Sequence, residues 1–396
     1  MFATQQQITS ISFNQDSSCF IAGRVDGFSI YHSDPFRELY RRTFADGYGV
    51  KCCAMLYRTS LIAFTGDTTQ NLLQYVAQCK QYQEQNAKQD APKSKFAHLH
   101  SPAYVPFDAI EQQFQPNVVY IYDDAVGKIL GRLRFRSEVF SIKMRKDVIC
   151  VALANQIYVH SLSDLTLLDV INTADYAPPF GLSTTEDDFV VAYVAPGIAG
   201  RAGLNFYLFS DVDSQENEVV RRYIDCHKSN ITALCLSENG QVLVTGSDAG
   251  KQIRVFQPVT QSPICCWKRG NDAAVITSIQ LQKNLEFAAV CSSKNTVHIF
   301  ALPQEIKELQ LKQVREMLDG GDVLTRESRS FTKYRLEDTD KNMQYCAAFS
   351  QNLGTFIVLT EKNEYHKVHF SPAERGPDGQ LKAKWMLVMN EESGKK

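Results

Sequence analysis

Short strand-forming runs recur along the 396-residue chain, and this internal repetition constrains the fold more than any other feature. Three copies open on nearly the same four residues, at positions 8–11 (ITSI), 231–234 (ITAL) and 276–279 (ITSI). Each copy continues through short apolar or alternating runs that are separated by turns rich in Gly, Asn and Asp. The copies close on similar strands, at positions 28–31 (FSIY), 253–256 (IRVF) and 297–300 (VHIF).

Four weaker copies begin near residues 50, 139, 181 and 344, which brings the number of units to seven. The clean spacings between neighbouring starts are close to the ~40 to 45 residues of a four-stranded propeller blade. The sequence therefore predicts an all-β fold, a seven-bladed β-propeller of the WD40 type, with residues 1–396 forming a single domain. Residues 385–389 are expected to add a late strand to the last blade, because a closed ring leaves no unpaired edge.

Two segments interrupt the repeat and are expected to project from the blades as insertions. Residues 78–116 are rich in Gln, Lys, Ala and Pro and show no strand pattern. Residues 303–330 have the pattern of a helix followed by a polar loop. Within this second insertion, residues 304–318 place their apolar side chains, Ile306 among them, in an arc of about 200° at 100° per residue, which favours an amphipathic helix.

Composition and motifs exclude several classes of protein. The chain is 44% hydrophobic with a net charge of −2, and no run approaches the ~18 apolar residues of a membrane span. Because the N-terminus also lacks a basic and apolar leader, we expect a cytoplasmic protein. Eleven cysteines without C-x-x-C spacing predict neither a zinc site nor a redox motif. No hydrolase, phosphate-loop or dinucleotide signature is present, so we expect no enzyme activity, no metal and no cofactor.

Charge is concentrated in one sector of the chain. Residues 221–270 contain seven Lys and Arg against three Asp and Glu, a balance of +4, whereas the remaining residues carry −6. Local fields of this kind attract an anion even when the net charge does not. The sector ends on Trp267-Lys268-Arg269-Gly270, directly after a strand-like run. Since successive side chains on a strand point to opposite faces, Lys268 and Arg269 are expected to face two separate pockets.

Polar side chains in the flanking units suit a phosphate ligand. Cations, imidazoles and hydroxyls all donate hydrogen bonds to phosphate oxygens. His227 and Arg254 lie in the unit on one side of the basic strand, and Ser292, Ser293, Thr296 and His298 lie in the unit on the other side. The same residues leave an alternative open, in which the segment is an ordinary solvated outer strand whose charges prevent edge-to-edge pairing.

The chain resembles the PROPPINs, the WIPI-type family of phosphoinositide-binding propellers. The resemblance covers residues 8–66, 118–302 and, more faintly, 328–370. It is carried by residues 13–16 (FNQD), 34–36 (DPF), 227–229 (HKS), 253–256 (IRVF), 267–270 (WKRG) and 296–300 (TVHIF). Residues 118–124 (VVYIYDD) and 136–139 (RSEV) are most similar to the WIPI branch that binds the rod-like lipid-transfer protein of autophagy.

This resemblance implies a peripheral membrane adaptor of autophagy that recognises phosphatidylinositol 3-phosphate and phosphatidylinositol 3,5-bisphosphate. It assigns His227, Ser247, Arg254 and Lys268 to a first headgroup site, and Arg269, Ser292, Ser293, Thr296 and His298 to a second. Here Trp-Lys replaces the Phe-Arg of the family's Phe-Arg-Arg-Gly motif. Because Lys lacks the planar fork of a guanidinium, the first site is expected to be the weaker one.

The resemblance also implies contacts beyond the headgroup. The 303–330 insertion lies where the family carries a membrane-inserting loop, so Leu311, Val314 and Leu318 are expected to touch the membrane. A partly ordered loop is the alternative, since the segment lacks Trp and Phe. The basic residues that follow, Arg326, Arg329 and Lys333, are expected to attract anionic lipid.

Asn14 and Asp16 are expected either to contact a lipid-transfer partner during autophagosome formation or simply to form their turn. We also expect the protein to be a monomer that associates with preautophagosomal (phagophore) and endosomal membranes and has no nucleic-acid partner. The competing hypothesis is a WD-repeat protein–protein scaffold without lipid binding.

Overall fold

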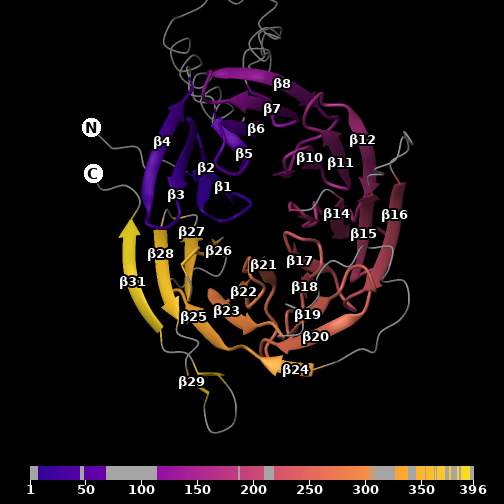
Figure 1. Cartoon of the computed structure of the whole chain (residues 1–396), viewed down its shortest axis with the longest axis vertical. Coiled ribbons are helices and arrows are strands. Elements are labelled where there is room, and N and C mark those ends of the chain that lie inside the picture. Colours follow the sequence, from indigo (N-terminus) through magenta and orange to yellow (C-terminus); the bar gives the residue numbers. More distant parts are fainter. Residues whose placement is uncertain are drawn as a thin grey trace, which may run out of the picture.

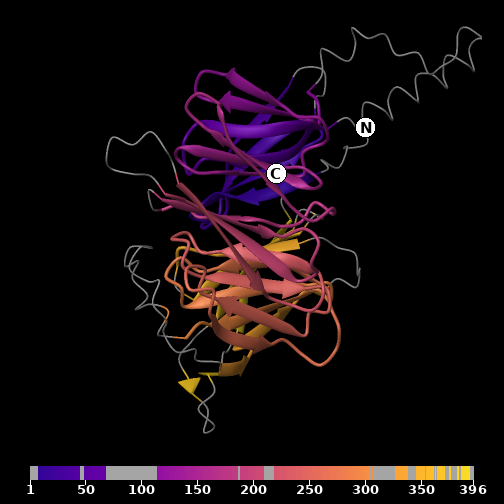
Figure 2. The same cartoon turned by 90° about the vertical axis from the view of Figure 1, so that its right-hand side faces the viewer.

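Seven β-sheets are arranged in a ring around a central axis, and the predicted seven-bladed propeller is confirmed (Figure 1). In the side view the N-terminal blades occupy one half of the ring and the blades of the basic sector the other (Figure 2). The computed structural model describes residues 8–44, 49–67, 114–185, 188–208, 218–303, 306, 326–337, 345–352, 354–360, 362, 364–370, 374–375, 381–382 and 385–392.

Blades 1 to 4 are antiparallel meanders of four strands each. Blade 1 contains β1 (Ile8–Phe13), β2 (Cys19–Arg24), β3 (Gly27–His32) and β4 (Arg37–Thr43). Blade 2 contains β5 (Gly49–Met55), β6 (Leu61–Asp67), β7 (Val118–Asp123) and β8 (Lys128–Arg134). Blade 3 contains β9 (Ser141–Met144), β10 (Val148–Ala152), β11 (Gln156–Ser161) and β12 (Leu167–Asn172). Blade 4 contains β13 (Gly181–Leu182), β14 (Phe189–Val194), β15 (Arg201–Leu208) and β16 (Glu218–Asp225).

Blades 5 to 7 use strands from the C-terminal part of the chain as their outer strands. Blade 5 contains β17 (Ile231–Leu236), β18 (Leu243–Ser247), β19 (Gln252–Phe256), β20 (Pro263–Lys268) and, outermost, β24 (Arg326–Arg329). Blade 6 contains β21 (Ile276–Leu281), β22 (Phe287–Ser292), β23 (Thr296–Ala301) and β25 (Thr332–Arg335). Blade 7 contains β26 (Tyr345–Phe349), β27 (Thr355–Thr360), β28 (Glu364–Phe370) and β31 (Trp385–Glu392), and β29 (Glu374–Arg375) pairs with β30 (Leu381–Lys382).

The predicted unit starts at 8, 50, 139, 181, 231, 276 and 344 fall at or within a few residues of the innermost strand of each blade. The late strand expected at 385–389 is also confirmed, because β31 pairs with β28 as the outer strand of blade 7. Repetition located these strands because each blade repeats the same local alternation and turn chemistry.

Apolar side chains from neighbouring blades pack against each other around the ring. Each of the seven main clusters of buried residues in the described part of the chain draws its members from two adjacent blades. A strand buried on both faces explains why the middle strands are largely apolar: Phe189–Val194 is apolar throughout, and Phe287–Ser292 is apolar except for its last residue. Side-chain packing therefore holds neighbouring blades together, and hydrogen bonds between blades, such as that from the Thr232 hydroxyl to the carbonyl oxygen of Ile276, add to it.

The ring closes between blade 1 and blade 7 without a shared strand. Phe20 and Tyr31 of blade 1 pack with Ile357 and Tyr365 of blade 7. Beside this contact, the buried carboxylate of Asp34 forms an ion pair with Lys367 and accepts hydrogen bonds from Ser350 and Asn352, both at 2.7 Å. These four polar groups join the first and last blades across the closure.

Replacing Asp34 by Ala is expected to destabilise the fold by about 3 kcal/mol, because Lys367 then keeps a largely buried charge without its partner. Burial raises the pKa of Asp34, but the hydrogen bonds from Lys367, Ser350 and Asn352 outweigh it, so the pKa lies below the usual ~3.9 of an Asp. A carboxyl group with a lowered folded-state pKa contributes stability at neutral pH that is lost as the pH falls through and below the unfolded-state value.

Chemical denaturation of wild type and Asp34→Ala between pH 7 and pH 3 measures this contribution, and the difference between the two proteins is expected to shrink towards the acid end. Asp225→Ala is the matched control, since its ion pair with Arg201 is exposed and is expected to contribute little. A difference between wild type and Asp34→Ala that stays constant over this pH range contradicts the assignment.

The two predicted insertions fall within blades 2 and 6. Residues 78–113 lie outside the described residues, in the connection between β6 and β7. In the second insertion the described ends differ from the expectation. Ile306, which was expected on the apolar face of a projecting amphipathic helix, is buried in the core between blades 5 and 6, and residues 326–329, expected as loop, form β24. Strand pairing to β20 supplies the hydrogen bonds that the sequence pattern did not reveal.

Candidate anion-binding site

A cavity of about 630 Å³ opens at the rim of blade 5. Five of its lining side chains are basic, and among the described residues that line it there is no Asp or Glu. It is bordered by His227, Lys228, Ser229, Ser247, Ala249, Lys251, Gln252, Arg254, Lys268, Gly270 and Asn271. A cavity with several cations and no carboxylate is suited to a multiply charged anion such as a phosphate.

Strand register brings the predicted first-site residues together. Lys268, the last residue of β20, lies opposite Gln252 on β19, and Cys266 lies opposite Arg254. Because residues two apart on a strand share a face, Lys268 and Arg254 project to the same side of blade 5. Ser247 ends β18 next to them, and His227 reaches the cavity from the connection between blades 4 and 5. All four residues predicted for the first site line this cavity.

Existing hydrogen bonds hold two of these side chains in place. Arg254 donates to the carbonyl oxygen of Cys226 at 2.8 Å, which fixes its guanidinium near His227. The Nε2 atom of His227 lies 3.0 Å from the hydroxyl of Thr245. Burial, together with the nearby charge of Arg254, lowers the pKa of His227 to about 4. The imidazole is therefore neutral at pH 7 without a ligand, and an anion in the cavity would favour its protonation.

Arg269 lies beyond the end of β20 and is directed away from this cavity. Its Nε donates to the carbonyl oxygen of Gly250 at 2.6 Å, and its guanidinium also bonds the carbonyl oxygen of Asp272. Burial lowers the pKa of Arg269, and its charge in turn contributes to the low pKa of His298 on blade 6. Lys268 and Arg269 thus serve opposite sides of the strand, as the alternation of side chains predicts.

His298 is the clearest sign of a second site. Its side chain is buried, and its Nδ1 has no hydrogen-bond partner among the described residues. Burial, with the charges of Arg269 and Lys333, lowers its pKa to about 4. Buried polar atoms nearly always have a partner, so an unsatisfied ring nitrogen close to two cations indicates a place where a ligand oxygen can bind.

The hydroxyl groups predicted for the second site have structural roles in the unliganded protein. Ser292 is fully buried and its hydroxyl donates to the carbonyl oxygen of Thr296. Thr296 donates in turn to the carbonyl oxygen of Lys294, and Ser293 accepts from the backbone of Val275. A direct headgroup contact by Ser292 is not compatible with this burial. Ser292 belongs to the frame of the second site rather than to its surface.

The register of blade 6 brings two further cations to this site: Lys333, which the sequence assigned only to general attraction of anionic lipid, and Arg335, which it did not single out. On β25, Lys333 lies opposite His298 and Arg335 lies opposite Thr296. Arg335 thereby occupies the place on blade 6 that Lys268 occupies on blade 5, where Lys268 lies opposite Gln252. The alternation in Lys333-Tyr334-Arg335-Leu336 was the available signal. It was not used because the outer strand of blade 6 follows the insertion and its register was unknown.

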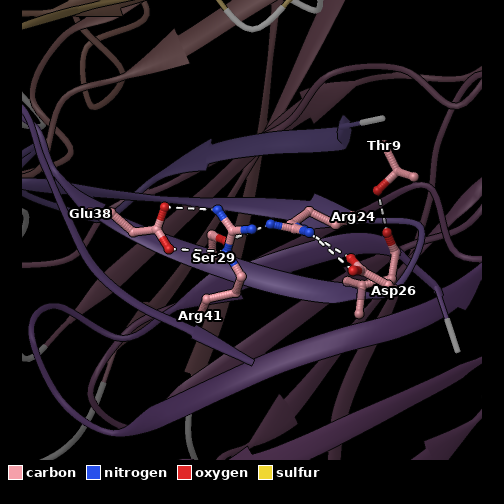
Figure 3. Close-up of polar contacts among 7 residues, drawn as sticks. Thr9, Arg24, Asp26, Ser29, Glu38 and Arg41 are labelled. Atoms are coloured by element: carbon pink, nitrogen blue, oxygen red, sulfur yellow. Dashed lines mark hydrogen bonds and ion pairs between the residues drawn. The ribbon is translucent and has the colours of Figure 1, made fainter. Parts of the chain in front are cut away.

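Blade 1 shows why the repeat alone does not create such a site. Arg24, Ser29 and Arg41 occupy register positions on β2, β3 and β4 that match Ser247, Arg254 and Cys266 of blade 5. In blade 1, however, Asp26 pairs with Arg24 at 2.9 Å and Glu38 pairs with Arg41 at 2.9 Å (Figure 3). The arginines of blade 1 are neutralised by neighbours, whereas the cavity of blade 5 lacks a carboxylate.

The remaining predicted contacts lie elsewhere or outside the described residues. Leu311, Val314 and Leu318 belong to the undescribed part of the second insertion. Asn14 is 3% exposed, and its amide donates to Ser18 and to the carbonyl oxygen of Tyr57, both at 3.1 Å. Asn14 therefore maintains its turn and offers little surface to a partner. Asp16 caps the same turn through Ser18 but stays partly exposed.

Two negative findings limit the chemistry of the described residues. They bring together no group of three or more His, Cys, Asp or Glu that could hold a metal ion. The part of the chain that the structure describes also contains no helix of the length and apolar character needed to cross a membrane. The candidate site is thus a basic cavity at the rim of a β-propeller, and the chemistry of its described lining is that of a propeller suited to bind anions.

Comparison with known proteins places the chain in a family. The PROPPIN family model matches residues 72–310, which is more than half of the chain, so the chain belongs to the PROPPIN family. Among curated proteins it is 24% identical over 393 residues to "Autophagy-related protein 18e" of Arabidopsis thaliana, covering 97% of this chain and 89% of that protein. It is 25% identical to "SVP1-like protein 2" of Pichia angusta, covering 92% of this chain and 91% of that protein.

Solved structures agree on the fold. "Kluyveromyces lactis Hsv2 complete loop 6CD" superposes with a TM-score of 0.70 at 17% identity, covering 98% of this chain and 99% of that chain. "Complex of KlAtg21 with coiled-coil of AgAtg16" superposes with a TM-score of 0.62 at 21% identity, with the same coverage. At these identities the likeness establishes the propeller and its topology.

Proposed function

We propose that this protein is a phosphoinositide-binding peripheral membrane adaptor of autophagy. It recognises phosphatidylinositol 3-phosphate and phosphatidylinositol 3,5-bisphosphate through two sites around Trp267-Lys268-Arg269-Gly270. The observation that supports this most strongly is the cavity at blade 5, in which His227, Arg254 and Lys268 converge without a carboxylate. Phosphate headgroups carry several negative charges and several acceptor oxygens, which match this set of donors.

The first site uses His227, Ser247, Arg254 and Lys268. The second uses Arg269, Ser293, Thr296 and His298 on a frame that includes Ser292, and Lys333 and Arg335 add charge to it. Two modest sites on neighbouring blades bind one membrane together, so their combined avidity exceeds either affinity. Leu311, Val314 and Leu318 of the insertion between β23 and β25, which lie outside the described residues, contact the same membrane in this proposal.

A role in autophagy follows from the family and from relatives that carry the name "Autophagy-related protein". The protein acts without catalysis. It is recruited from the cytoplasm as a monomer to preautophagosomal and endosomal membranes, where it presents other blades to an autophagy lipid-transfer protein. Of Asn14 and Asp16, only Asp16 is assigned to the contact with this partner, because Asn14 is buried. A related propeller was solved in "Complex of KlAtg21 with coiled-coil of AgAtg16", so propellers of this fold present surfaces to proteins.

Flotation with liposomes tests the lipid claim. Purified protein is expected to float with vesicles that contain phosphatidylinositol 3-phosphate or the 3,5-bisphosphate, and to stay in the soluble fraction with vesicles of phosphatidylinositol. Matching the surface charge with phosphatidylserine is the control, because general attraction to anionic lipid does not depend on the inositol phosphate.

The competing function, a protein–protein scaffold whose basic sector binds an acidic peptide, predicts a different result. Flotation that is absent, or that does not depend on inositol phosphorylation, would favour the scaffold. The blade 5 cavity favours lipid binding over this alternative because His227, Arg254 and Lys268 converge on one cavity, as a compact phosphate group requires, whereas an acidic peptide is bound equally well by an extended basic strand.

A further inference from the structure

The strand that follows the second insertion lies against the outer edge of blade 5. β24 pairs in parallel with β20, and its last pair places Arg329 opposite Lys268 (Figure 1). The chain then continues to β25, the outer strand of blade 6. One short stretch of the C-terminal chain therefore covers the outer edges of both blades that carry the candidate sites.

Register determines which way Arg329 projects. Residues opposite each other on adjacent strands send their side chains to the same face of the sheet, with the strands ~4.8 Å apart. Lys268 lines the cavity, so Arg329 projects to the cavity side of the sheet, one strand further out. Arg329 is exposed to solvent. Its guanidinium is within reach of a ligand that is bound at Lys268.

The chemistry of the cavity leaves a role for this guanidinium. Lys268 supplies a compact point charge, and Arg254 already donates to the carbonyl oxygen of Cys226. A planar guanidinium at the outer rim, able to hold two phosphate oxygens at once, is the donor that the motif of this chain lacks.

We propose that Arg329 is an anion-binding residue of the blade 5 site, brought there by the pairing of β24 with β20. It binds the phosphate group held at Lys268 and so provides a guanidinium on the outer side of this cavity. The inference rests on the proposed function, because it assigns a further residue to the same site. It differs from general attraction to the membrane, since Arg329 contacts the headgroup itself.

Titration with a soluble headgroup separates these two roles. Soluble short-chain phosphatidylinositol 3-phosphate, measured by calorimetry, is expected to bind Arg329→Ala about tenfold more weakly than wild type, as loss of one charge-assisted contact predicts. Arg329→Lys keeps the charge but not the fork and is expected to give an intermediate affinity. Arg134→Ala, which removes an exposed arginine from the outer strand of blade 2, is the matched control and is expected to bind like wild type.

Each contrary result has a defined meaning. Wild-type affinity of Arg329→Ala for the soluble headgroup, combined with weakened binding by Lys268→Thr, overturns the role of Arg329 and leaves the site intact. Loss of flotation by Arg329→Ala with unchanged soluble binding also overturns it, in favour of general electrostatics. Unchanged binding in both Arg329→Ala and Lys268→Thr overturns the blade 5 site and the role of Arg329 with it, whereas absence of binding by the wild-type protein overturns the proposed function itself. Thermal unfolding of each variant confirms that the propeller is folded.

Discussion

Flotation of the double variant Lys268→Thr/Arg269→Thr with vesicles containing phosphatidylinositol 3-phosphate is expected to be abolished. In the proposed function the two cations belong to different sites: Lys268 lines the blade 5 cavity, and Arg269 lies close enough to His298 for its charge to lower the pKa of that imidazole. Removing both therefore weakens both sites at once. Loss of one charge-assisted contact costs about 1.5 to 3 kcal/mol, and the loss of bivalent attachment multiplies the two effects.

The single variants and a charge-matched control make this result interpretable. Each single Thr variant is expected to retain weak flotation, since one site remains. Arg132→Thr/Arg134→Thr removes the same charge from exposed positions on β8 and is expected to float like wild type. Equal flotation of the Lys268→Thr/Arg269→Thr protein and wild type would sink the lipid-binding claim.

Replacing Trp267 by Ala is expected to lower the stability of the fold by about 4 kcal/mol, which is within the range for removal of a large buried aromatic. Trp267 is fully buried between blades 5 and 6, and its ring stacks on Phe300 with centroids 4.9 Å apart. The cavity left by Ala removes the support under the segment that carries Lys268 and Arg269, so headgroup binding is expected to weaken as well. Chemical denaturation and flotation measure the two effects.

Trp267→Phe is the informative companion to this variant. The Nε1 atom of Trp267 is buried without a partner among the described residues, which carries an energetic penalty of about 1 to 3 kcal/mol. The Trp267→Phe change removes the unsatisfied Nε1 atom but also reduces the volume that fills the core. It places Phe where the Phe-Arg-Arg-Gly motif has Phe. We expect a change in stability of less than about 1.5 kcal/mol. A loss of stability as large as that of Trp267→Ala would mean that the indole ring itself is required.

Much of the candidate site was predictable because it depends on local rules. Side-chain alternation along the outer strand of blade 5 separates Lys268 from Arg269, and the structure places them on opposite sides. When the repeated units are aligned, Arg254 corresponds to His298, and the structure places both residues at equivalent positions on the third strands of their blades. These inferences needed only strand geometry and the spacing of the units.

Other features depended on contacts that local patterns do not encode. The hydroxyl of Ser292 was expected to face a ligand, but Ser292 is fully buried, and Tyr345 of blade 7 bonds its backbone N–H and carbonyl oxygen. The amide of Asn14 is occupied by Tyr57 of the next blade. Ile306 fitted a membrane-facing arc by periodicity, yet it fills the core between two blades. In each case a neighbouring blade decided the role of the residue.

The sequence by itself determined that this chain is a ring of seven blades with a basic segment on the fifth, because strand alternation, turns and repeat spacing are local properties. Only the tertiary structure decided which charges share a site. Lys333 and Arg335 join His298, and Arg329 joins Lys268, through strand pairs whose members are more than 30 residues apart in the chain. It also decided that Arg24 and Arg41 of blade 1 form ion pairs with nearby carboxylates, whereas the described lining of the cavity around Arg254 contains no Asp or Glu, because the interaction of two charges depends on their distance in space.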